Sequence, residues 1–184
     1  MSSTETETSP RRRFFLEVFY LSQLGIFLGA IAGIVWGYGA PRSQITGVEG
    51  DRVSFDPMSS APIGADMLFM LIAFLCALIL VFVVYKIAFV NPLPTLFGVL
   101  IGSALGTLAM YLIGSFLGNM GNSDPTQLAV GETTDAALEI NATGVFFVWP
   151  FWAAVLVALI CWRKSRGLSK ELKKIPAYPP VPHA

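Results

Sequence analysis

The sequence predicts an all-α, polytopic membrane protein: a four-helix transmembrane bundle with glycine-rowed first and third helices. The 184-residue chain is 54% hydrophobic and only 13% charged, whereas a soluble domain carries about 25% charged residues. Four apolar runs, at about 14–38, 63–85, 93–117 and 144–162, are each close to or longer than the ~20 residues that a helix needs to cross a bilayer core. Helices are expected because the backbone in lipid must satisfy its own hydrogen bonds.

The apolar runs divide the chain into an arm, a membrane domain and a tail. Residues 1–13 are polar, rich in Ser and Thr, and typical of a disordered arm. The membrane domain covers 14–162, with extracytoplasmic loops at 39–62 and 118–143. Residues 163–184 form a basic and then proline-rich tail. We interpret the first run as an uncleaved anchor, because it is too long for a signal peptide and no A-x-A-like site follows it.

Basic residues gather on one side of the predicted bundle. Ten lie there, against only Arg42 and Arg52 on the other side. The positive-inside rule therefore predicts a plasma-membrane protein with both termini in the cytoplasm. The groups flanking the first and fourth spans are expected to lie against the anionic membrane surface; they include Arg11, Arg12, Arg13, Arg163, Lys164 and Arg166. We expect the lipid bilayer as a partner and no nucleic acid.

Glycines recur at every fourth position of two spans. The first span carries Gly25, Gly29, Gly33 and Gly37; the third carries Gly98, Gly102, Gly106, Gly114 and Gly118, with Met110 in the same register. Residues four apart share one helix face, and small residues let helix backbones approach closely in lipid. We favour contact between the first and third spans within the chain, because these two spans run parallel. A seam between copies, or with a foreign helix, is the alternative.

The loop at 39–62 predicts a β-hairpin that turns at Gly50-Asp51. Such a turn sets Glu49 opposite Arg52 and Val48 opposite Val53. A lone hairpin is marginally stable, so we expect it to lean on the loop at 118–143. In that second loop, Asp124 and Thr134 are expected to begin short helices.

Span four carries three tryptophans and an internal proline. Trp149, Trp152 and Trp162 are interpreted as interfacial belt residues. Pro150 is expected to kink the helix near its outer end.

Chemistry-bearing motifs do not emerge from the sequence. Asp66 is placed in the first turn of span two, where a helix dipole favours a carboxylate; Arg42 or Arg52 is its expected partner on the outer side. The alternative for Asp66 is contact with an ion or substrate. Cys76 and Cys161 fall in apolar runs without metal-binding spacing. We predict no catalytic residue, no cofactor and no metal ligand.

Several segments together resemble an uncharacterised family of small four-span membrane proteins from actinobacteria. They are WGYGAP at 36–41, GADMLF at 64–69, GSFLG at 114–118 and LEINATGVFFVWP at 138–150. The resemblance covers about residues 20–162 in the same order. It implies a host with a mycolate-type envelope and a cytoplasmic-membrane location. It carries over no catalytic residue.

Together these patterns favour a non-enzymatic membrane protein. We expect an accessory or scaffold subunit of a larger cell-envelope or respiratory complex, with other membrane subunits as partners. The alternative is a small transport or permeation component that acts as a homo-oligomer, although the polar mid-membrane residues that such a path needs are missing. A membrane enzyme ranks third.

Overall fold

The computed structural model describes residues 10–49, 52–55, 59–87, 92–122 and 128–172. Within this part of the chain, four helices are long and apolar enough to cross a membrane. They are α1 (Pro10–Gly39), α2 (Ala61–Ile87), α3 (Pro92–Gly118) and α4 (Val148–Leu172). The predicted all-α four-helix bundle of a multi-pass membrane protein is thereby confirmed.

The helices extend beyond the predicted spans at both ends of the chain. Residues 10–13, expected in the disordered arm, form the first turn of α1, and residues 163–172, expected in the tail, continue α4. Pro10 suits a helix start because the first helical N–H groups have no intrahelical acceptor. The remaining arm and tail, 1–9 and 173–184, fall outside the described residues.

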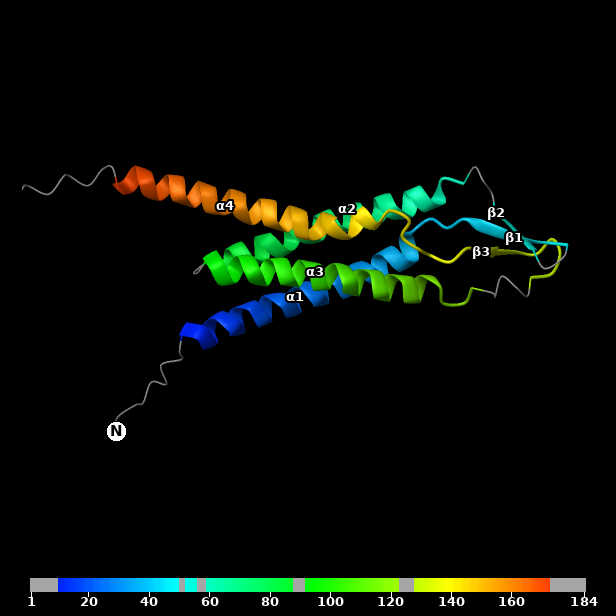
Figure 1. Cartoon of the computed structure of the whole chain (residues 1–184), viewed down its shortest axis with the longest axis horizontal. Coiled ribbons are helices and arrows are strands. Elements are labelled where there is room, and N and C mark those ends of the chain that lie inside the picture. Colours follow the sequence, from blue (N-terminus) through cyan, green and yellow to red (C-terminus); the bar gives the residue numbers. More distant parts are fainter. Residues whose placement is uncertain (1–9, 50–51, 56–58, 88–91, 123–127, 173–184) are drawn as a thin grey trace, which may run out of the picture.

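The bundle consists of two parallel helix pairs. α1 packs most extensively against α3, and α2 packs against α4; contacts of α3 with α4 and of α1 with α2 close the ring. In Figure 1 the start of α1 and the end of α4 lie at the end opposite the strands, and α1 and α3 run side by side. The consecutive helices α2 and α3 contact each other least of the neighbouring pairs.

The contact between α1 and α3 is a ladder of glycines. A β-carbon on Gly25 would overlap the carbonyl oxygen of Gly102, and one on Gly29 that of Gly106. Further along α1, a β-carbon on Gly33 would lie 2.7 Å from the Met110 oxygen, and one on Gly37 2.7 Å from the Gly114 oxygen. We call this contact the glycine seam; all nine predicted row glycines are buried.

The seam is reciprocal. A β-carbon on Gly106 would lie 2.6 Å from the oxygen of Gly25, and one on Gly114 2.9 Å from the oxygen of Gly33. Each helix thus presents its Cα atoms to the carbonyls of the other, the arrangement in which weak Cα–H···O contacts recur. Both rows are used within a single chain, which is the first of the two arrangements considered from the sequence.

Two tryptophans extend the core from the seam to the other helices. Trp149, at the start of α4, is fully buried, and its ring would contact a β-carbon on Gly106 at 2.8 Å. Its assignment to the interfacial belt is therefore wrong, whereas Trp152 and Trp162 are exposed. Pro150 lies in the first turn of α4, where no N–H is needed, so it stands at a helix start instead of the expected kink.

Three short strands cap the bundle. β1 (Gln44–Val48) lies between β2 (Arg52–Phe55) and β3 (Thr133–Asp135), and both pairings are antiparallel. The hairpin therefore leans on the second loop, as expected. Thr134 lies within β3, so the prediction that a short helix begins there is wrong. Asp124, where the other short helix was expected, falls outside the described residues.

The hairpin register differs from the predicted one by one residue. Val48 pairs with Arg52 and Gly47 with Val53, whereas the sequence predicted Val48 opposite Val53; the expected turn residues Gly50 and Asp51 lie outside the described residues. Gly47 explains why the register is specific. Its N–H donates to the Glu132 oxygen at 2.9 Å and its oxygen accepts from Gly131 at 2.9 Å, while a β-carbon on Gly47 would overlap the Ala129 oxygen.

Candidate functional site

The strongest concentration of specific polar contacts lies where the strands meet the helices, which we call the sheet end. The segment at residues 135–142, here the junction segment, runs from β3 to the 3₁₀ helix η2 (Thr143–Phe147) that leads into α4. It bonds to Asp66 in α2, to Asn119 just after α3, and to Arg42 and Ser43 between α1 and β1. It therefore fixes the sheet relative to the bundle.

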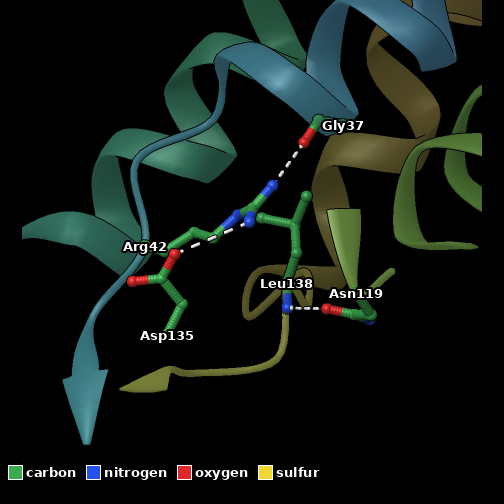
Figure 2. A network of polar contacts seen from close by, with 5 residues as sticks. All are labelled: Gly37, Arg42, Asn119, Asp135 and Leu138. Carbon is green, nitrogen blue, oxygen red and sulfur yellow. Dashed lines mark hydrogen bonds and ion pairs between the residues drawn. The ribbon is translucent and has the colours of Figure 1, made fainter. Parts of the chain in front are cut away.

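Arg42 joins the end of α1 to the junction segment (Figure 2). Its guanidinium donates a 2.8 Å hydrogen bond to the Gly37 oxygen and lies 3.7 Å from the Asp135 carboxylate. A cation at a helix C-terminus is favoured by the helix dipole and supplies a donor to a carbonyl left free there. Next to it, the Ala136 N–H donates to the Ser43 oxygen at 2.7 Å.

Asn119 makes the corresponding bond from the end of α3. Its Oδ1 accepts a 2.6 Å hydrogen bond from the Leu138 N–H, as Figure 2 shows. The Leu138 side chain is 3% exposed and packs where a β-carbon on Gly118 would lie, 2.6 Å from that position. The last glycine of the seam thus makes room for the junction segment.

Asp66 holds the junction segment to α2. Its carboxylate accepts hydrogen bonds from the N–H groups of Asn141 at 3.2 Å and Ala142 at 3.0 Å, and it is only 6% exposed. These donors precede η2, so the carboxylate lies at the start of the helical segment that becomes α4. Hydrogen bonds to an ionised acceptor are about twice as strong as neutral ones.

The first-turn position predicted for Asp66 is therefore wrong, and one of its two expected partners, Arg42, bonds elsewhere. Asp66 is the sixth residue of α2 and lies beyond its first turn, and it acts on the start of a different helical segment. Arg42 is not its partner, because the guanidinium bonds to Gly37 and Asp135. The side chain of Arg52, the other expected partner, falls outside the described residues.

Trp36 ties the seam to α2 near the same end. Its indole N–H donates to the Ala65 oxygen at 3.0 Å, and its ring meets Phe69 edge-on with centroids 5.1 Å apart. Gly114 lies beneath this ring, since a β-carbon there would overlap it. Sequence reasoning missed Trp36, Asn119 and Leu138 as site residues; only Trp36 carried a signal, a tryptophan inside a glycine row.

A cleft of about 230 Å³ lies beside the junction segment, with Arg42, Glu139 and Asn141 among its lining residues. Among the described residues, no group of three His, Cys, Asp or Glu side chains lies close enough to hold a metal ion. What this arrangement does is hold the sheet in place: two helix ends, one buried carboxylate and one guanidinium fix a short segment.

Three hydroxyl groups inside the bundle are bonded to their own helices, whereas the buried Ser115 hydroxyl has no partner among the described residues. Ser22 donates to the Val18 oxygen at 2.8 Å. Ser103 donates to Leu100 and Thr107 to Ser103, each at 2.9 Å. Such bonds to the preceding turn satisfy these groups locally, so they serve the helices instead of lining a path between them.

The opposite end of the bundle, here the basic end, carries the predicted membrane-surface residues. All six are exposed there; they are Arg11, Arg12, Arg13, Arg163, Lys164 and Arg166. The Arg166 guanidinium lies 3.9 Å from the ring centroid of Trp162, a cation–π contact that suits a residue at the membrane boundary.

Comparisons with family models, with curated proteins and with solved structures each found no match to this chain.

Proposed function

We propose that the chain is a non-enzymatic accessory or scaffold subunit of a larger membrane assembly, of the cell-envelope or respiratory kind. In this proposal it lies in the plasma membrane, with the basic end in the cytoplasm and the sheet end outside. The distribution of basic residues supports this orientation. The envelope type and the bacterial group follow only from the sequence resemblance and stay predictions.

The observation that carries the proposal is the fixed sheet. A three-stranded sheet this small is marginally stable alone. Here the junction segment bonds to Asp66 of α2 and to Asn119 after α3, and its Asp135 pairs with Arg42, which bonds to the end of α1. A preformed surface loses little conformational entropy on binding. Such a surface, held rigidly above the membrane, is what a docking subunit needs.

Apolar side chains on the fixed sheet offer a contact. Val48 is 44% exposed and Val130 is 67% exposed. Val48 directly follows Gly47 and Val130 directly precedes Gly131, whose N–H donates to the Gly47 oxygen, so the turn that carries Val130 lies beside the end of β1. Outside the lipid, such a pair adds apolar area to an interface.

Co-purification of the full chain in mild detergent tests the proposal. We expect a foreign membrane protein in stoichiometric amount, lost from the Val48→Ser/Val130→Ser variant. Val35→Ser is the matched control, because Val35 is a similarly exposed valine on α1 and its loss leaves the sheet unchanged. A pure homo-oligomer of the wild-type chain with a water-filled central path would overturn the proposal in favour of a permeation component.

A further inference from the structure

A groove lies between α2 and α4 at the basic end. It has a volume of about 890 Å³; its walls include Leu78, Leu156 and Ile160, and its mouth carries Lys86, Arg163 and Lys164. The walls belong to helices that cross the membrane, and the mouth lies where those helices leave it. The groove is therefore apolar along its length and basic at one end.

Among the described residues that line the groove, every charged side chain is basic. Lys86 comes from the last turn of α2, and its ammonium lies 5.7 Å from the ring centroid of Phe82, another wall residue. Arg163 and Lys164 are adjacent in α4 and exposed. Three cations from two helices thus converge on one opening.

We propose that this groove binds an anionic phospholipid, with an acyl chain between α2 and α4 and the phosphate held by Lys86, Arg163 and Lys164. Basic pockets between transmembrane helices favour anionic head groups, and arginine pairs with phosphate through two parallel hydrogen bonds. A zwitterionic lipid fills the apolar part equally well but gains much less at the mouth. The proposal needs only the membrane location, so it stands apart from the accessory role.

Native mass spectrometry of the full chain tests the site. The protein in detergent is titrated with phosphatidylglycerol or with phosphatidylcholine of the same acyl chains. We expect one tightly retained phosphatidylglycerol, bound roughly tenfold or more tightly than phosphatidylcholine. Equal retention of the two lipids would overturn the proposal.

One variant and a matched control locate the binding. Lys86→Gln/Arg163→Gln/Lys164→Gln is expected to lower phosphatidylglycerol binding to the phosphatidylcholine level. Arg11→Gln/Arg13→Gln/Arg166→Gln removes the same charge from the same end, outside the groove, and is expected to leave binding unchanged. An equal loss in this control would show general surface attraction and would refute the site.

Filling the groove tests the acyl-chain half of the proposal. Ile160→Trp keeps every charge and is expected to abolish the tight binding of phosphatidylglycerol. Helical content by circular dichroism is expected to stay at the wild-type level. Undiminished binding in a folded Ile160→Trp protein would overturn the proposal. Should Ile160→Trp fail to fold, the Lys86→Gln/Arg163→Gln/Lys164→Gln variant alone decides the outcome, because its substitutions are at exposed positions.

Discussion

Gly29 lies so close to Gly106 that a β-carbon on Gly29 would overlap the Gly106 carbonyl oxygen. The neighbouring atoms are backbone atoms of α3, which cannot rotate away as a side chain does. At this distance the two helices contact through their backbone atoms and not through side chains. Such close backbone contact favours helix association in lipid.

Gly29→Ala should therefore destabilise the bundle by about 1–3 kcal/mol, the usual cost of overpacking, although alanine is the better helix former. Gly167→Ala in α4 is the control, because nothing lies within 4 Å of a β-carbon there; it should be neutral or stabilise by up to about 1 kcal/mol. Unfolding in detergent by titration with a denaturing surfactant measures both. Equal stability of the two variants would contradict the glycine seam.

Comparing Trp36→Phe with Trp149→Phe separates the stability contributed by a buried hydrogen bond from that contributed by burying an aromatic ring. Both indoles are fully buried, but only Trp36 donates, to the Ala65 oxygen; the Trp149 N–H has no partner in the described structure. We expect Trp36→Phe to cost about 1 kcal/mol more than Trp149→Phe, the net worth of one hydrogen bond. Thermal unfolding followed by circular dichroism compares the two; a larger loss in Trp149→Phe would count against this account.

Asp66→Asn should loosen the junction segment. The amide keeps one acceptor oxygen where the carboxylate has two, so either Asn141 or Ala142 loses its bond. An unsatisfied buried donor costs about 1–3 kcal/mol. Hydrogen exchange of the 141–142 amides should speed up accordingly, whereas Glu139→Gln, at an exposed position, should leave their exchange rates within error of wild type.

Arg42→Gln and Asp135→Asn test which half of the ion pair matters. Arg42 also bonds to the end of α1, with its side chain 21% exposed, while the Asp135 side chain is 47% exposed. We expect a loss of about 1.5–3 kcal/mol for Arg42→Gln and of less than about 1 kcal/mol for Asp135→Asn. Similar losses in chemical denaturation would mean that the ion pair, and not the bond to Gly37, is the important contact.

Cysteine labelling tests the proposed orientation. In a Cys76→Ala/Cys161→Ala background, Thr133→Cys at the sheet end should react with a membrane-impermeant maleimide in intact cells. Ser165→Cys at the basic end should react only after the membrane is opened. Both positions are exposed, so access through the membrane decides the result. The reverse pattern would invert the orientation.

The helices were predictable because their signals are local and repeated. Apolar length located α1 to α4, and glycines at every fourth residue indicated which faces allow close approach. The register of the hairpin was not predictable in this way, since it depends on the contact of Gly47 with residues 129–132. The turn residues Gly50 and Asp51 suit a two-residue loop equally well.

The sheet-end site was largely hidden from the sequence for a related reason. Residues 135–142 have no periodicity, and the partners of this segment come from distant parts of the chain, as Asp66 and Asn141 do. Trp149 was misassigned because an aromatic residue at a membrane boundary and one in a bundle core look alike in sequence.

The pairing of α1 with α3 has a consequence for biogenesis. During synthesis α1 enters the membrane before α3, and the helix that fits its glycine face is separated from it by all of α2. Until α3 emerges, that face lies against lipid chains, which conform poorly to a grooved backbone. The glycine seam therefore forms only after α3 has inserted. A nascent chain halted after α2 lacks the contact between α1 and α3.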